Sequence, residues 1–428
     1  MIDELEAIFR RESGRCVASL IRIFGDIDLA EDAVAEAFAI AVEKWPRSGI
    51  PSNPGGWIMT TARNRVIDVL RRESVARHRQ RDAQRLRTDD TTTHDGPDPA
   101  VLSAHDDCVD VVTDNQLRLM FLCAHPCLSI DAQVALTLRL LGGLTTNEIA
   151  KAFVVPESTL AQRIVRAKRR LLDNCASFCI PDAAEFPERL QAVLATIYLI
   201  YTEGHTATSG PELARVDLSH EAIRLGRTLT TLVPGEAEAV GLLALMVLSE
   251  SRRLARVDPD GAMVRLADQD RSRWDRRMID EGHELVRTCL RLDAPGPFQI
   301  QAAIAAVHCL APTAEATDWR VIVSLYDDLY ARRPNAVVTL NRAVAVGELL
   351  GPSTGLAALA QVDTESLEHY QPYHAAHADL LSRAGRLAEA RVAYDRAIEL
   401  TTNDVERDFL IRQRARCHGG RPPTFLED

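Results

Sequence analysis

The sequence predicts an all-α protein built from several helical domains. Apolar residues recur at intervals of three and four along most of the chain, and the alternating pattern of strands is nearly absent. The 428 residues exceed what one ordinary hydrophobic core holds together, and this length suggests roughly three domains. A polar stretch at residues 75–112, with few large apolar side chains, separates the first helices from the rest and predicts a flexible linker.

The composition describes a globular chain, with 46% apolar and 26% charged residues. No apolar run reaches the roughly 18 residues that a membrane span requires. Acidic residues occur early, and the first thirty residues contain no apolar segment typical of a signal peptide. We therefore expect a cytoplasmic protein that makes no contact with a membrane.

Residues 1–74 are predicted to form helices. Apolar side chains follow helical spacing from Cys16 to Phe24 and again from Ala30 to Val42. A turn rich in proline and glycine follows at residues 46–56, and a further helix is expected from about Trp57 to Arg72. We interpret Trp57 as a packing residue and the arginines of this helix as phosphate contacts.

Charge is distributed in blocks. The chain as a whole has a net charge of −11, which argues against a general nucleic-acid binder. Residues 63–87, however, contain nine arginines and three acidic residues, whereas residues 88–114 contain eight aspartates and neither lysine nor arginine. This segregation predicts a face that binds nucleic acid, followed by an acidic tether.

Residues 136–171 have the pattern of a helix-turn-helix. Gly142 and Gly143 end one helix, and Thr145 or Thr146 can cap a short second helix in which Glu148 completes a capping box. Pro156 fits only at the start of a third helix. The predicted buried face of that helix consists of Leu160, Ile164, Ala167 and Leu171.

The opposite face of this third helix predicts a DNA-reading surface. A helix that enters the major groove presents short polar side chains at its N-terminus to base edges, and basic side chains further along to phosphates. The side chains of this face are Ser158, Thr159, Gln162, Arg163, Arg166, Lys168, Arg169 and Arg170.

From about Asp182 onwards the chain again has helical spacing. Residues 372–400 form two helical patterns broken at Arg383–Arg386, with alanines where helices must approach closely. One helical hairpin in about 34 residues is the period of a tetratricopeptide repeat, and residues 325–350 read as a degenerate earlier copy.

Taken together, these motifs resemble the extracytoplasmic-function (ECF) sigma factors of bacterial RNA polymerase. Asp28–Phe38 (DLAEDAVAEAF) resembles the region 2 segment that docks on the clamp helices of the polymerase β′ subunit. Pro54–Glu73 resembles the segment that recognises the −10 element, and Leu144–Leu171 resembles region 4, which reads the −35 element and contacts the β flap. The resemblance assigns core-polymerase binding to Asp28, Glu31, Asp32, Glu36 and Phe38; −10 binding to Arg63, Asn64, Arg65, Arg71 and Arg72; and −35 binding to Ser158, Thr159, Gln162, Arg163, Arg166, Lys168 and Arg169.

The chain departs from the group at two positions and in its length. Ala35 stands where the group often has glutamine, and Ala161 stands where it often has a basic residue. The chain also resembles a subgroup with a long C-terminal helical extension that ends in tetratricopeptide-like repeats and offers a surface for a protein partner or ligand. The expected domains are residues 1–74 (region 2), 75–112 (acidic linker), 113–177 (region 4), 182–320 (helical extension) and 321–428 (repeats).

Other functions remain open on the sequence. One alternative is a stand-alone helix-turn-helix regulator with a sensory helical domain, which would bind duplex DNA as a dimer. An enzyme would need an acid/base or metal set among Glu203, His205, Asp268, Asp270, Asp275 and His283, but no motif fixes the spacing of these residues. The pairs Cys123/Cys127 and Cys175/Cys179 have the spacing of a metal or redox site. For the first pair, the surrounding apolar run favours small buried thiols instead, and Pro126 would disturb the helical geometry that brings the two residues together. We expect no enzymatic activity, no cofactor and no metal.

Overall fold

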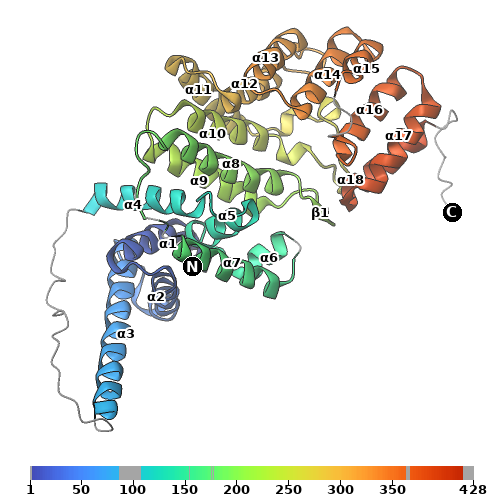
Figure 1. Ribbon diagram of the computed structural model, residues 1–428. Helices are drawn as coiled ribbons and strands as arrows, with labels where there is room; N and C mark the ends of the chain where they lie inside the picture. Colours follow the sequence, from blue (N-terminus) through green and yellow to red (C-terminus); the bar gives the residue numbers. More distant parts are fainter. Residues whose placement is uncertain are drawn as a thin grey trace. The chain divides into compact units, whose positions relative to one another are not determined.

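The computed structural model describes residues 2–85, 108–153, 155–174, 176, 178–362 and 367–417, and its ribbon is drawn in Figure 1. The chain divides into two compact units, residues 1–196 and 197–428. Within the described residues the structure is helical, apart from two strands of two residues each, which confirms the predicted all-α class. No described helix is both long and apolar enough to span a membrane.

The first unit begins with three long helices, of which α1 packs against both α2 and α3. Helix α2 continues through Pro46 and ends at Gly49, whose φ of 81° is left-handed. Helix α3 is longer than the sequence pattern indicates, because it continues to Arg85, inside the predicted linker. Residues 86–107, which hold most of the predicted linker, lie outside the described residues. The bounds are α1 (Ile2–Phe24), α2 (Ile27–Ser48) and α3 (Pro54–Arg85).

The core of these three helices contains most of the apolar positions that the sequence pattern indicates, together with Phe9 and Trp45, whereas Val42 is 58% exposed. Trp45 and Ile58 are fully buried, and Trp57 packs edge-to-face on Trp45 with ring centroids 5.3 Å apart. Phe9 of α1 contacts Phe38 of α2 in the same geometry, with centroids 4.4 Å apart. The predicted packing role of Trp57 is therefore confirmed.

In the part of the chain that the structure describes, five further helices and a π-helical turn follow, and the last of these helices continues into the second unit. They are α4 (Cys108–Cys123), α5 (Ile130–Leu136), a π-helical turn (Thr137–Leu141), α6 (Thr146–Ala152), α7 (Glu157–Asp173) and α8 (Phe186–His205). The boundary between the two units falls after Thr196, inside α8. The first half of α8 packs on the first unit: Phe186 contacts Phe121 edge-to-face, with ring centroids 5.5 Å apart, and Arg189 donates a hydrogen bond to the Phe121 carbonyl at 2.8 Å.

The second unit consists of successive antiparallel helices that lie side by side in chain order (Figure 1). Its elements are β1 (Ser209–Gly210), α9 (Val216–Leu232), α10 (Ala237–Glu250), α11 (Arg276–Leu292), α12 (Pro297–Leu310), α13 (Trp319–Arg332), α14 (Ala336–Leu350), α15 (Pro352–Leu359), α16 (Gln371–Arg383), α17 (Leu387–Leu400), β2 (Thr402–Asn403) and α18 (Asp404–Arg416). Three single turns of 3₁₀ helix cover Arg253–Ala255, Leu266–Asp268 and Arg271–Arg273.

Both hairpins expected from the sequence are present in the second unit. Helices α16 and α17 form the hairpin at residues 372–400, and Gly385 in the break has a φ of 77°. Small residues pack between the two helices, among them Ala378, Ala390 and Ala397, which are fully buried. Helices α13 and α14 form the second hairpin, at residues 325–350.

A short parallel strand pair joins the two ends of the second unit. Ser209 and Gly210 pair with Thr402 and Asn403. The side chain of Asn403 is completely buried, and its amide donates hydrogen bonds to the carbonyls of Ala207 (3.1 Å) and Glu212 (2.8 Å). Two segments that are nearly two hundred residues apart in the sequence are thus joined by hydrogen bonds.

Candidate nucleic-acid interface

Helices α6 and α7 form the helix-turn-helix that the sequence predicts. Thr145 caps α6: its hydroxyl accepts a hydrogen bond from the Glu148 amide at 3.1 Å, and the Glu148 carboxylate accepts one from the Thr145 amide at 2.7 Å. The reciprocal bonds of a capping box fix where α6 starts. Pro156 immediately precedes α7, and Leu160, Ile164, Ala167 and Leu171 are buried as expected.

The outward face of α7 carries most of the predicted −35 residues. Ser158, Thr159 and Gln162 are exposed at and near its N-terminus, where short polar side chains can reach base edges. Further along, Arg166 is exposed and donates to Gln162 at 3.2 Å, and Arg169 is 82% exposed. Arg163 is half-buried and lies 3.5 Å from the carboxylate of Asp131.

A groove of about 630 Å³ runs between this face of α7 and the start of α5. Arginines dominate its charged lining, and all four have a partner within the unit. Besides the contacts of Arg163 and Arg166 given above, Arg170 donates to the Cys127 carbonyl at 3.5 Å, and Arg169 lies 3.8 Å from Asp173. A groove with this charge is suited to a polyanion. Its lining residues are Leu128, Ser129, Ala132, Thr159, Gln162, Arg163, Arg166, Ala167, Arg169, Arg170 and Asp173.

Lys168 occupies a different position from the other predicted −35 residues. Its side chain is only 11% exposed, and its amine lies 2.5 Å from a carboxylate oxygen of Asp28 and 2.7 Å from one of Glu31. Burial disfavours the charged amine, but the two carboxylates outweigh burial, so the pKa of Lys168 is raised. Lys168 follows Ile164 by four residues and precedes Leu171 by three, so its spacing matches the buried face of α7.

The predicted −10 residues lie along the middle of α3. Asn64, Arg71 and Arg72 are exposed, whereas Arg63 and Arg65 are half-buried. A carboxylate oxygen of Glu36 on α2 lies 2.7 Å from the Arg65 guanidinium. The side chains of the arginines from Arg77 onwards lie outside the described residues.

The predicted core-polymerase residues of α2 differ in their exposure. Asp28 and Asp32 are exposed, and Glu36 is 48% exposed although it pairs with Arg65. Glu31 is 13% exposed and binds Lys168 and also Arg139, a residue that the sequence analysis did not select. The sequence did contain a signal for Arg139, because it is a single basic residue within the largely apolar segment Leu136–Leu141. Phe38 is buried against Phe9, so the structure places its ring in the core.

The acid/base residues of the second unit are mostly engaged as caps and ion pairs. Glu203 accepts from the Thr208 hydroxyl at 2.6 Å, Asp270 caps one short 3₁₀ turn, and Asp275 caps α11. His205 bonds to Tyr201 at 3.1 Å, and burial holds its pKa well below the usual value. Among the described residues, no three histidine, cysteine or acidic side chains are grouped as a metal site would require.

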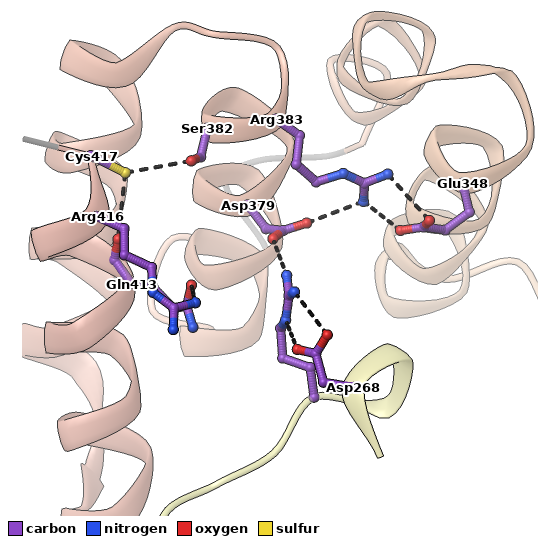
Figure 2. Close-up of polar contacts among 9 residues, drawn as sticks. Asp268, Glu348, Asp379, Ser382, Arg383, Gln413, Arg416 and Cys417 are labelled. Atoms are coloured by element: carbon purple, nitrogen blue, oxygen red, sulfur yellow. Dashed lines mark hydrogen bonds and ion pairs between the residues drawn. The ribbon is translucent and has the colours of Figure 1, made fainter. Parts of the chain in front are cut away.

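A polar chain links the Leu266–Asp268 turn to the helical hairpins of the second unit (Figure 2). Arg265 donates to Asp268 at 2.8 Å and to Asp379 of α16 at 3.5 Å. Asp379 also accepts from Arg383 at 3.3 Å, and Arg383 reaches Glu348 of α14 at 3.2 Å. In this unit the paired arginines and acids therefore connect elements that are separated in the sequence, namely the Leu266–Asp268 turn, α14 and α16.

The cysteines of the described residues are thiols rather than disulfides. Cys123 is fully buried, and burial raises its pKa; burial also raises the pKa of Cys127. The amide of Cys127 donates to His125 Nδ1 at 3.2 Å, which occupies that ring nitrogen. Cys175 lies outside the described residues, so the pair Cys175/Cys179 stays a prediction.

In the first unit, two segments match models of known protein families. Residues 8–75 match sigma-70 region 2, and residues 118–171 match sigma-70 region 4. The chain is 28% identical over 172 residues to a probable ECF RNA polymerase sigma factor, SigI, of Mycobacterium tuberculosis, covering 40% of this chain and 56% of that protein. These findings support a sigma factor of the ECF type, a class of transcription initiation factor that is not enzymatic.

A second comparison extends over almost the whole chain. It is 42% identical over 414 residues to an uncharacterized protein of Rhizobium meliloti (strain 1021), covering 97% of this chain and 96% of that protein. The chain belongs to the same family as this rhizobial protein. Residues 189–290 match a family of unknown function, DUF6596, which places the start of the second unit in a defined family without a known activity.

Proposed function

We propose that this chain binds core RNA polymerase and directs it to promoters that carry −35 and −10 elements. The observation that carries the proposal is the presence, on one chain, of region 2 and of a region 4 helix-turn-helix whose second helix has an exposed cationic face. A stand-alone regulator would need the second feature but not the first.

In this proposal α7 reads the −35 element. Ser158, Thr159 and Gln162 contact base edges, and Arg163, Arg166 and Arg169 hold the phosphates on either side. All of these side chains except the half-buried Arg163 are exposed, and all except Ser158 line the α5–α7 groove, which supports the assignment. Lys168 belongs to this set only in a form of the protein in which its carboxylate partners have been released.

Region 2 supplies the other contacts in this proposal. The −10 element is bound by Arg63, Asn64, Arg65, Arg71 and Arg72 of α3, and unstacked bases are captured as the duplex opens. The acidic residues Asp28, Glu31, Asp32 and Glu36 of α2 face the β′ clamp helices of the polymerase, while Phe38 supports them from the core. The β flap is the expected partner of region 4.

The second unit acts in this proposal as a built-in docking or regulatory unit in the cytoplasm. Its consecutive helical hairpins support a tetratricopeptide-like solenoid, which offers a long surface to a protein partner or ligand. The ion-paired links between the Leu266–Asp268 turn, α14 and α16 favour a unit that moves as one piece.

Run-off transcription with purified core polymerase, on promoters upstream of the gene and its neighbours, tests the proposal. The full chain is compared with Arg163→Ala/Arg166→Ala, and with the control Arg287→Ala/Arg291→Ala, which removes the same charge from α11 of the second unit. We expect transcript from the full chain and the control, and a loss of more than about tenfold at moderate salt in the α7 variant, because two phosphate contacts are removed.

Two results would contradict the proposal. Equal transcription from the α7 variant and its control would show that α7 does not bind the promoter. Absence of core binding by the full chain, together with a dimeric footprint on a palindromic site, would favour the stand-alone regulator instead.

A further inference from the structure

The segment that joins α10 to α11 in the second unit, residues 251–275, holds arginines and aspartates in nearly equal number. It contains six arginines and five aspartates, so pairing within the segment could neutralise almost all of its charge. Asp268 does pair with an arginine of the segment. Three other aspartates instead accept hydrogen bonds from backbone amides, namely Asp258, Asp270 and Asp275. Local turns and caps thus take up carboxylates that could have faced arginines.

Three arginines of this segment form no ion pair with any described residue. They are Arg252, Arg256 and Arg271, and we call them the arginine cluster. Arg256 donates to the His205 carbonyl at the end of α8, and Arg271 donates to the His308 carbonyl of α12 at 2.6 Å. These carbonyls are uncharged, so they hold the two guanidinium groups in place without neutralising them.

Arg252 lacks even an uncharged partner. It follows α10 directly and is half-buried, and no described residue forms a hydrogen bond with its guanidinium, which keeps contact with solvent. Two groups that can become negative lie near it, the Tyr201 hydroxyl of α8 and the Cys309 thiol of α12. Burial raises the pKa of both, so both are neutral at physiological pH. Arg252 is therefore a cation without a counter-ion, since arginine does not lose its proton in proteins.

Neighbouring bases indicate that the electrostatic potential around Arg252 is positive. Burial and the charge of Arg252 lower the pKa of Arg256 to about 10. Burial, Arg252 and Arg271 together lower the pKa of His308 to about 4. An environment that disfavours the protonation of bases favours the binding of an anion.

Three carboxylates act on the arginine cluster from a distance without pairing with it. Glu250 and Glu406 act on Arg256, and the exposed Glu315 acts on Arg271. Burial raises the pKa of Glu250 and of Glu406, which makes both of them weaker counter-ions. The excess of positive charge therefore remains at the end of α10.

We propose that the second unit binds a small molecule through an oxyanion, a carboxylate or a phosphate, that pairs with Arg252. The planar fork of a guanidinium donates two parallel hydrogen bonds to such a group. A partly buried cation without a counter-ion is unfavourable, and an anionic ligand removes this cost. Arg256 and Arg271, which are held by carbonyls, add attraction over a longer range.

The inference goes beyond the proposed function, because it names the chemistry of a ligand for the second unit. A small ligand suits the site better than a nucleic-acid backbone does, since the guanidinium is half-buried rather than on the open surface. Binding at Arg252 requires neither core polymerase nor a promoter. It can therefore be tested on the full chain alone.

Three substitutions separate charge, geometry and position. Arg252→Met removes the cation and keeps an apolar stem, whereas Arg252→Lys keeps the charge and removes the fork. The matched control is Arg273→Met, which removes the same charge from an exposed position of the same segment. Neither position is assigned to DNA or polymerase.

Hydrogen exchange of residues 251–275 measures binding where the ligand is expected. Sodium phosphate or sodium acetate replaces sodium chloride at constant ionic strength. At a probe concentration of about ten times its Kd, exchange through opening of the site should slow about tenfold in wild type and in Arg273→Met. It should not slow in Arg252→Met, and Arg252→Lys should bind about tenfold more weakly, because one charge-assisted hydrogen bond is lost. A response to only one of the two probes identifies the oxyanion as phosphate or carboxylate.

Thermal unfolding without either probe provides a second test. Arg252→Met should unfold at the same temperature as wild type or at a higher one, because it loses a cation that has no counter-ion. A lower temperature would show that Arg252 supports the fold, which contradicts the proposal.

Two exchange results would also overturn the proposal. Equal slowing in wild type and Arg252→Met would show that the anions act elsewhere, for example on the cationic face of α7. Unchanged exchange of wild type with both probes would show that the arginine cluster binds no oxyanion. Since neither measurement involves polymerase or DNA, these failures are distinguishable from a failure of the proposed function.

Discussion

Asn403 and Asn335 provide a direct comparison of a tertiary hydrogen bond with a purely local one. Each caps a helix of the second unit: Asn403 accepts from the Glu406 amide at 3.1 Å, and Asn335 accepts from the Val338 amide at 2.9 Å. Only Asn403 also donates to two distant carbonyls, those of Ala207 and Glu212. Asn335 is exposed, and its amide donates to a carbonyl two residues away.

Aspartate at these positions keeps the cap and removes the donors. Aspartate is about as good an N-cap as asparagine, so we expect Asn335→Asp to change the free energy of unfolding by less than about 0.5 kcal/mol. Asn403→Asp loses two donors and leaves two carbonyls opposite a buried carboxylate. At about 1–3 kcal/mol for each unsatisfied buried group, we expect a loss of roughly 3–5 kcal/mol.

Hydrogen exchange of residues 207–213 and thermal unfolding measure this difference. A loss of about 3 kcal/mol corresponds to roughly a hundredfold faster exchange through local opening. It also corresponds to a fall of about 6–12 °C in the transition of a unit of this size. Similar exchange and similar transitions in the two variants would refute the reasoning, because they would show that the strand pair contributes nothing beyond its cap.

Three further predictions concern stability. Thr145→Ala should lower the thermal stability of the first unit by about 1 kcal/mol and weaken promoter binding in parallel, as a capping-box loss predicts; binding that weakens without any loss of stability would contradict a capping role. A chain ending at residue 176 should melt at a lower temperature by circular dichroism than one ending at residue 206, because it lacks Phe186 against Phe121; equal melting would show that α8 does not support region 4. Burial, reinforced by Arg252 and Arg271, lowers the pKa of His308 to about 4. As pH falls below about 6.5, the unfolded chain therefore binds a proton at this histidine before the folded chain does. The free energy of unfolding of the second unit should decrease between pH 6.5 and 4, and this decrease should be smaller in His308→Asn.

Local signals in the sequence determined most of the elements. The helix-turn-helix is predictable because its capping box, its proline and its buried face all act within a few residues of one another. The longer extent of α3 was not predictable, because its second half lacks a sustained apolar period and its polar sequence reads equally well as linker. Phe38 lies at one of the regularly spaced apolar positions of α2, and this spacing already predicts that its ring is buried. The family resemblance had assigned the same residue to polymerase binding.

The sequence by itself determined the all-α class, the helix-turn-helix and the cationic face of α7, since helical period and capping are short-range properties of the chain. Only the tertiary structure decided which charges face solvent. Lys168 and Arg166 lie two residues apart in one basic run, yet Arg166 is exposed and Lys168 is buried on Asp28 and Glu31. The physical reason is that a cation is stable either in water or beside a carboxylate, and the choice depends on a surface 140 residues away.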